Sequence, residues 1–272
     1  MKKIHIRLLS HTIVLFVIAQ VLAMIVADHI RALGAVSLVG EGEMTLTLFL
    51  TYFVLATLVV LLLTKLYRGH FFYRLIFLLA LGAGLVVVFQ LVFPLNVSLF
   101  ISAIFCLGLY FLPIIWVHNI GVIIASAGLG SVLGLQMSWQ VAAWLLAVLS
   151  AYDVFAVFVT GHMIHLEQTF IARKASFALV IPESWYGLYE QLGTVRPSGG
   201  FLILGGGDVI LPMFLTIAIA PVNLLAAIYA IVGSLFGLLA NHIVLMKWQH
   251  PIPALPMIAA GCLAGLAIGI FL

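Results

Sequence analysis

Two aspartates, Asp153 and Asp208, fall inside long apolar runs of the 272-residue sequence, where carboxyl groups are rare. They occur in LSAYDVFAVFVTG and in FLILGGGDVILPMF, whereas the other six of the eight acidic residues lie in two longer polar segments. An aspartate near the middle of a membrane helix costs about 2.5–3.5 kcal/mol on insertion scales. Each of the two therefore needs a function or a polar partner.

A pair of such carboxyls could hydrolyse a peptide bond. Two carboxyls that meet in a water-poor site do not both ionise cheaply, so the pair holds one shared proton near neutral pH. One carboxylate takes a proton from water, and the protonated partner donates to the oxygen of the scissile carbonyl. The alternative role of a lone membrane aspartate is a hydrogen bond between helices.

The rest of the chain has the composition of a polytopic membrane protein. Hydrophobic residues make up 65% of it and charged residues 7%, and the mean hydropathy is +1.34. A spanning helix needs about 20 apolar residues, and this length predicts an all-α fold with nine transmembrane helices. The predicted spans are 10–27, 44–64, 72–93, 96–115, 119–136, 139–160, 201–219, 222–245 and 253–272.

The basic residues predict the orientation, because Lys and Arg of short loops stay on the cytoplasmic side. With the N-terminus in the cytoplasm, ten of the eleven fall in or beside cytoplasmic segments, and only Arg31 lies outside. Nine spans then place the C-terminus on the opposite face. No clear cleavage site follows the first span, so we expect it to be retained. We therefore expect one multi-pass domain over residues 1–272, with a cytoplasmic loop at about 161–200 between spans six and seven.

The predicted spans bring the two aspartates to the same depth. Asp153 lies about eight residues before the sixth span ends at Gly161, and Asp208 about seven residues after the seventh begins at Phe201. At 1.5 Å per residue, both lie about 10–12 Å from the cytoplasmic boundary. Because these spans run in opposite directions, the two carboxyls can meet, which favours a catalytic pair over two separate hydrogen bonds.

Three consecutive glycines, Gly205, Gly206 and Gly207, precede Asp208. They remove side chains from the helix surface, which allows close helix approach, and they weaken the helix where water must enter. Glycines also form ordinary packing surfaces in membranes.

The last span begins with HPIPALPMI, which contains Pro251, Pro253 and Pro256. Prolines at this spacing disfavour a regular helix and leave backbone groups that lipid penalises unless they face protein or a wet cavity. An ordinary proline at a helix start is the simpler alternative.

Three short strings together resemble the motifs of a known family. Tyr152-Asp153, Gly205-Gly206-Gly207-Asp208 and Pro253-Ala254-Leu255 look like the YD, GxGD and PAL motifs of the presenilin and signal peptide peptidase family of intramembrane aspartyl proteases. The order of the motifs and the nine predicted spans fit as well. The small size of the chain favours a microbial or archaeal homologue, and the predicted orientation is that of presenilin.

The resemblance implies an endopeptidase that cuts single-span transmembrane helices or signal-peptide remnants within the lipid bilayer. It implies no cofactor, no metal and no nucleic-acid partner, and it allows a homo-oligomer. The implied site residues are catalytic Asp153 and Asp208, site-shaping Tyr152, Gly205, Gly206 and Gly207, and substrate-binding Pro253, Ala254 and Leu255.

The loop between the two aspartates departs from the family pattern. The stretch from His162 to Gly200, about 39 residues, is much shorter than the loop of animal presenilins, so we expect the chain to work uncut. Within it, the apolar segment Ala175–Ile181 favours either an interfacial stretch or a strand edge for substrate. His162 and His165 are spaced like metal ligands, but without a third ligand they are interpreted as interfacial histidines.

Two other functions are compatible with paired membrane acids. A type IV prepilin peptidase also uses acids of the GxGD type, although the YD and PAL strings speak against it. A proton-coupled transporter could use the two aspartates as a relay, but the sequence has no internal repeat and both acids lie near one face. Zinc and serine proteases are disfavoured because HExxH and GxSG motifs are absent.

Overall fold

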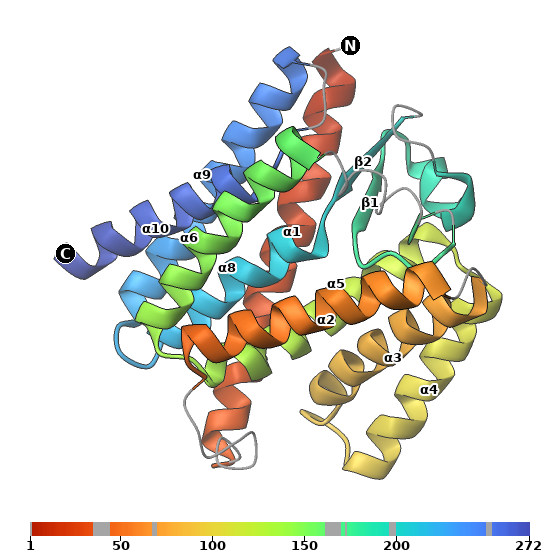
Figure 1. The fold of residues 1–272 in the computed structure, drawn as a ribbon, viewed down its shortest axis with the longest axis horizontal. Helices are drawn as coiled ribbons and strands as arrows, with labels where there is room; N and C mark the ends of the chain where they lie inside the picture. Colours follow the sequence, from red (N-terminus) through yellow and green to blue (C-terminus); the bar gives the residue numbers. More distant parts are fainter. Residues whose placement is uncertain are drawn as a thin grey trace.

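The computed structural model describes residues 2–34, 44–66, 70–160, 170–171, 173–195, 200–248 and 252–272. These residues are mostly helical and form nine α-helices of at least 14 residues, arranged as a bundle with a small β-hairpin beside it (Figure 1). The helices are α1 (Lys2–Ala32), α2 (Leu46–Leu66), α3 (His70–Phe89), α4 (Leu95–Phe111), α5 (Ile115–Leu135), α6 (Trp139–Phe155), α8 (Gly206–Ile219), α9 (Leu224–Trp248) and α10 (Leu255–Phe271).

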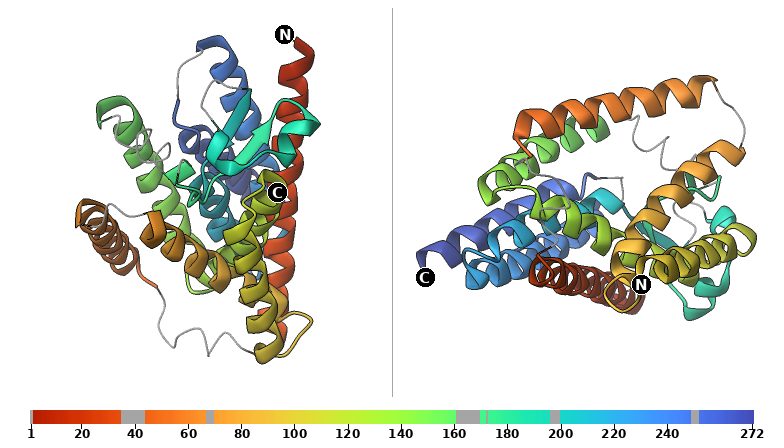
Figure 2. Two further views of the ribbon diagram at one scale, coloured as in Figure 1. Left: turned by 90° about the vertical axis from the view of Figure 1, so that its right-hand side faces the viewer. Right: turned by 90° about the horizontal axis from the view of Figure 1, so that it is seen from below.

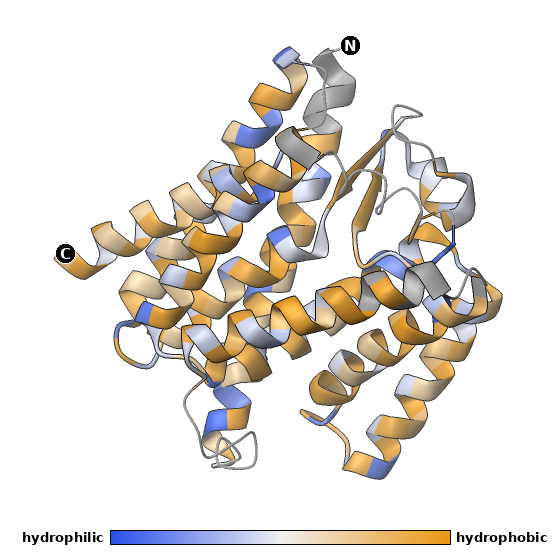
Figure 3. Cartoon of the chain, viewed as in Figure 1, coloured by the Kyte–Doolittle hydropathy of each residue, from blue (hydrophilic) through white to orange (hydrophobic). Residues whose placement is uncertain are grey.

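Most residues of these helices are apolar, as the colouring by hydropathy shows (Figure 3), which is the pattern of helices that face lipid as well as one another. Five described stretches are long and apolar enough to cross a bilayer: Leu8–Ala32, Phe71–Phe89, Ile115–Leu135, Trp139–Phe158 and Leu224–Trp248. The apolar stretches of α2, α4, α8 and α10 have 10 to 17 residues. The chain is therefore an integral, multi-pass membrane protein.

The prediction for the start of the seventh span was wrong. Residues Phe201–Leu204 form strand β2, and helix α8 begins only at Gly206. Strand β2 pairs antiparallel with β1 (Leu179–Pro182), with Leu179 opposite Leu204. A four-residue apolar run has no periodicity that distinguishes a strand from a buried helix. Here the pairing with β1 determines that the run is a strand. Strand β1 overlaps the segment Ala175–Ile181, which was expected to be an interfacial stretch or a strand edge.

Glycines allow two pairs of helices to touch through their backbones. A Cβ added to Gly128 of α5 would lie 2.1 Å from the carbonyl oxygen of Gly84 of α3. A Cβ on Gly233 of α9 would lie 2.1 Å from the carbonyl oxygen of Gly261 of α10. No side chain fits at either contact, so small residues fix the positions of these helices.

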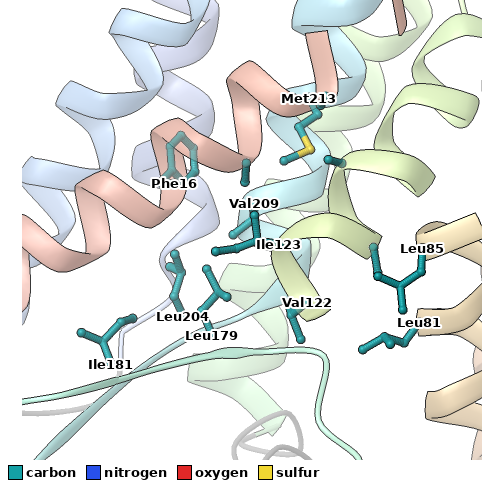
Figure 4. Close-up of a cluster of buried hydrophobic side chains, with 14 of the residues drawn as sticks. Phe16, Leu81, Leu85, Val122, Ile123, Leu179, Ile181, Leu204, Val209 and Met213 are labelled. Carbon is teal, nitrogen blue, oxygen red and sulfur yellow. The ribbon is translucent and has the colours of Figure 1, made fainter. Parts of the chain in front are cut away.

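Helix α8 lies between two clusters of buried side chains. The first cluster joins α1, α3, α5, the hairpin and α8, as Figure 4 shows for Phe16, Leu81, Leu85, Val122, Ile123, Leu179, Ile181, Leu204, Val209 and Met213. The second cluster joins α6, α8, α9 and α10 through Leu145, Leu146, Leu149, Phe214, Leu215, Ala226, Leu255 and Ala259. The two clusters hold α8 from both sides.

Polar groups inside the bundle align α1 with α8. The Gln20 side chain donates to the carbonyl oxygen of Val209 (3.3 Å), and the Arg31 guanidinium donates to that of Ile217 (2.5 Å). A cation near the C-terminus of a helix also interacts favourably with the helix dipole. By contrast, α2 lies at the edge of the bundle (Figure 2) and exposes most of its large apolar side chains.

Candidate active site

Asp153 lies in the last turn of α6 and is in contact with the start of α10. Helix α6 begins after Ser138, whose hydroxyl accepts the Val141 N–H as an N-terminal cap. The half-buried Asp153 carboxylate accepts a hydrogen bond from the backbone N–H of Leu255, the first residue of α10. The tyrosine–aspartate and proline–alanine–leucine strings therefore meet in space.

The proline-rich segment delays the start of α10. Ile252 and Pro253 are not helical, Ala254 is the N-cap residue, and Pro256 occupies the first helical turn, where a missing N–H is tolerated. The N-terminus of α10 is thereby directed at Asp153. A helix N-terminus offers unpaired N–H groups and a positive dipole end, and both stabilise a carboxylate.

Asp208 lies in the first turn of α8, immediately after β2. Its N–H donates to the carbonyl oxygen of Gly205 (3.1 Å), and its side chain is partly buried. Like Asp153, it is therefore beside a helix N-terminus. Ile210 and Leu211, which follow it, pack in the second cluster together with Leu149 of α6 and Leu255. Helices α6, α8 and α10 pack against one another in pairs around this region.

The three glycines before Asp208 have different surroundings. A Cβ on Gly206 would lie 2.2 Å from the carbonyl oxygen of Phe177, so no side chain fits there. A Cβ on Gly205 would lie 3.1 Å from the Asp208 carboxylate, whereas one on Gly207 would meet nothing within 4 Å. Gly206 therefore lets the strand-to-helix turn approach the segment before β1, and Gly207 leaves room beside Asp208.

This difference predicts unequal effects of alanine at two neighbouring positions. Gly206→Ala should lower the Tm of the detergent-solubilised protein, because the backbone must move to admit the Cβ, and overpacking typically costs about 1–3 kcal/mol. Gly207→Ala should leave Tm unchanged or slightly raised, because alanine is the better helix former. Thermal unfolding of both variants tests this, and equal losses of Tm would contradict the assigned contacts.

Tyr152 connects the site to α2 through a series of aromatic contacts. Its ring meets Phe53 of α2 edge-on, with centroids 6.2 Å apart. Phe53 stacks near Phe49 (6.5 Å), and Phe49 meets Phe214 of α8 edge-on (6.0 Å). Sequence reasoning missed Phe49 and Phe53. Their spacing of four residues, which puts them on one helix face, was the available signal.

Two further features border the site. After Phe155 the chain continues as a π-helix (Ala156–Thr160), a form often found at functional sites. The β-hairpin leads directly into Asp208, and its sheet has two strands among the described residues. His162 and His165, interpreted above as interfacial, lie outside the described residues.

One edge of the hairpin has no strand paired to it within the part of the chain that the structure describes. The N–H and C=O of Val180 both bond to the side chain of Asn119, so they point away from β2. In an antiparallel pair, the residue opposite also points its N–H and C=O outward, and that residue is Ile203. The outer edge of β2, five residues before Asp208, therefore presents a backbone donor and acceptor.

Comparisons with known proteins agree with this architecture. A family model described as "Signal-peptide peptidase, presenilin aspartyl protease" matches residues 13–272. Two solved structures of a presenilin family intramembrane aspartate protease, in C222 and P2 crystal forms, are each 21% identical to this chain. The C222 structure has a TM-score of 0.65, covering 94% of each chain; the P2 structure has 0.67, covering 95% of this chain and 96% of the other. A search of curated proteins gave no match.

Proposed function

Since the chain belongs to the signal-peptide peptidase and presenilin aspartyl protease family, we propose that it hydrolyses peptide bonds within single-span transmembrane helices or signal-peptide remnants, with Asp153 and Asp208 as its catalytic pair. The observation that carries this proposal is the hydrogen bond from Leu255 to Asp153, which joins two of the three family-like strings. The third string delivers Asp208 at the start of the neighbouring helix α8. Family membership favours neither the prepilin peptidase nor the transporter.

The surroundings of the two acids suit a pair that carries one shared proton. Both carboxyls lie at helix N-termini, Asp208 in the first turn of α8 and Asp153 against that of α10. Two positive dipole ends favour the single negative charge of the pair. One carboxylate then activates water while the protonated partner donates to the scissile carbonyl, and the roles reverse as the amine leaves.

The short α8 supports water access to this pair. Its 14 residues extend about 21 Å, less than the hydrocarbon thickness of about 30 Å. Strand β2 covers the remaining thickness of the membrane on the cytoplasmic side, and its outer edge carries backbone N–H and C=O groups. Open strand edges inside a membrane are tolerated only where they line a wet cavity or are covered by protein. We infer that the outer edge of β2 lines a wet cavity, and that this cavity supplies the water for hydrolysis.

The substrate must lose its helical hydrogen bonds before its carbonyls can be attacked. The family resemblance implied that the segment Pro253–Leu255 binds the substrate. In the structure, Leu255 is already helical and its N–H bonds to Asp153, so this segment has little backbone left for pairing. We propose instead that the opened substrate adds as a strand to the outer edge of β2, with the Pro253–Leu255 element holding Asp153.

A proline at position 203 tests this strand addition. Ile203→Pro removes the outward N–H without removing a bond to β1, so cleavage should fall about tenfold or more, as expected when a strand loses a backbone partner. Ile203→Ala keeps the N–H and should retain most of the activity. The measurement is the initial cleavage rate of a tagged single-span substrate. Similar rates for the two variants would argue against pairing at this edge.

The topology belongs to the same proposal. Each of the nine predicted spans overlaps one α-helix, which supports nine crossings. The excess of Lys and Arg on one side supports a cytoplasmic N-terminus and a C-terminus on the opposite face. The single domain over residues 1–272 and the cytoplasmic loop at about 161–200 remain part of this proposal.

Reconstitution tests the proposed activity. The purified protein is placed in lipid vesicles with a tagged single-span helix, and the products are analysed by mass spectrometry. Two complementary peptides that meet within the membrane span are the expected result. Intact substrate, under conditions in which the enzyme remains folded, would rule the proposal out.

A further inference from the structure

Two adjacent polar residues near the start of α5, His118 and Asn119, are buried against β1. His118 is fully buried and Asn119 is 4% exposed. The Asn119 amide donates to the carbonyl oxygen of Val180 (2.7 Å), and its oxygen accepts the Val180 N–H (3.0 Å). His118 Nε2 lies 2.9 Å from the carbonyl oxygen of Ala178. A carbonyl only accepts, so Nε2 is the protonated nitrogen.

These side chains take the place of a third strand. Asn119 pairs with both backbone groups of one residue, as a neighbouring antiparallel strand would do. Strand β1 thus has both edges occupied, one by β2 and the other by α5. Among the described residues, the edge of the sheet left open is that of β2, and β2 runs through Gly205 into the turn that carries Asp208.

The start of α5 holds the chain after β1 as well. The Ile115 N–H donates to the carbonyl oxygen of Glu190 (3.0 Å), and the Leu192 N–H donates to that of Pro113 (2.8 Å). Helix α5 is itself fixed against α3 by the glycine contact described above. The hairpin is therefore attached to a firmly packed helix rather than to the exposed surface.

We propose that Asn119, supported by His118, is a positioning residue for the protease: it fixes the depth and register of β2 beside Asp208 and thereby selects which peptide bond is cut. Neither residue touches the reacting groups in this proposal; they act through β1 and β2. The inference rests on the proposed function, because a cut site exists only if the chain cleaves a substrate.

Asn119→Leu tests the proposal, because leucine keeps the number and branching of the side-chain heavy atoms and removes both hydrogen bonds. The substitution leaves both backbone groups of the buried Val180 without their partner, so the hairpin should loosen from α5. We expect kcat to fall about tenfold or more. We also expect the cut positions to spread by about one or two residues along the substrate, because a strand that loses its register moves in steps of one residue. Product masses report the positions directly.

Asn223 provides a matched control at the other end of the bundle. Its amide donates to the carbonyl oxygen of Gly269 (3.2 Å), and its oxygen accepts the Ala226 N–H (3.0 Å). Asn223→Leu thus removes the same two kinds of bond, but far from the hairpin in the sequence and at the start of α9. It should lower Tm and leave the cut positions of the wild type unchanged.

Three outcomes separate the possibilities. Shifted cuts in Asn119→Leu together with unshifted cuts in Asn223→Leu would support positioning. Wild-type cut positions in Asn119→Leu, with activity lost only in proportion to the folded fraction, would overturn it. If the wild-type protein cleaved nothing, the proposed function would fail. Amide hydrogen exchange would then test separately whether Asn119 holds the hairpin: exchange at Phe201–Leu204 as slow in Asn119→Leu as in the wild type would overturn that role.

Discussion

Replacing either Asp153 or Asp208 by asparagine should reduce cleavage of a single-span substrate by about 10²–10⁴-fold, the usual contribution of general acid–base catalysis. Asparagine matches the size of aspartate, and at position 153 its oxygen can still accept the Leu255 N–H. An amide cannot exchange the proton that the pair must share, so chemistry fails while the fold remains. Removing a carboxyl group from the membrane also removes the free-energy cost of burying it, so Tm should be unchanged or higher.

Asp28→Asn is the control for this pair of variants. Asp28 has a side chain that is 85% exposed and lies 3.7 Å from Arg31, near the C-terminal end of α1. Asp28→Asn makes the same replacement of a carboxyl group by an amide without touching the site. Cleavage by a well-folded Asp153→Asn or Asp208→Asn protein at the rate of Asp28→Asn would exclude the catalytic pair.

Removing the single N–H of Leu255 should slow cleavage by roughly 10- to 100-fold, because a hydrogen bond to a charged group contributes about 1.5–3 kcal/mol. The change is made by incorporating the α-hydroxy acid analogue of leucine, which turns the peptide bond between Ala254 and Leu255 into an ester. The side chain stays and the donor to Asp153 is lost, while the Ala254 carbonyl, which accepts the Ile258 N–H, becomes a weaker acceptor. Cleavage rates under single-turnover conditions measure the effect.

Leu224 offers the matched ester control. It is the first residue of α9, as Leu255 is the first residue of α10, so the same bond is changed at the same position of a helix. That variant should cleave at the wild-type rate. Equal slowing by both esters would show that the Leu255 N–H has no specific role at Asp153.

The sequence predicted the helices well because a membrane span is encoded in its own length and apolarity. The predicted spans and the observed helices agree within a few residues at most of their ends. It predicted the packing poorly, since helices that are apolar on all sides give no face that marks a partner. The close contact of Gly84 with Gly128 could be read from the sequence only as a surplus of small residues.

The hairpin shows why the site was only partly predictable. The apolar run Phe201–Leu204 continues the composition of a span, and its identity as a strand depends on pairing with residues about 20 positions earlier. The sequence places Asn119 only at the start of the predicted span 119–136, whereas in the structure it is buried and bonds to β1. Both features depend on contacts between segments far apart in the chain, which local patterns do not contain.

The three motifs identified the residues of the candidate site but not what each residue contacts. The sequence could not distinguish the surroundings of Gly205, Gly206 and Gly207, and the structure gives each a different one. The three prolines were expected to interrupt the last span, and α10 does begin only at Leu255. The role of that interruption, which is to bring a helix N-terminus to Asp153, required the positions of both helices.

The position and chemistry of the cut test directly whether Asp153 and Asp208 form the catalytic pair. Reconstituted enzyme is given a single-span substrate in water enriched in heavy oxygen, and both products are weighed. Asp153 lies about 10 Å from the end of the π-helix by helix rise, so cuts should cluster about that far inside the cytoplasmic boundary. Each new carboxyl terminus should carry one heavy oxygen from water, and both asparagine variants should form these products about 10²–10⁴ times more slowly. Cuts near the external face, or the same products formed at the wild-type rate by the asparagine variants, would contradict the assignment of Asp153 and Asp208 as the catalytic pair.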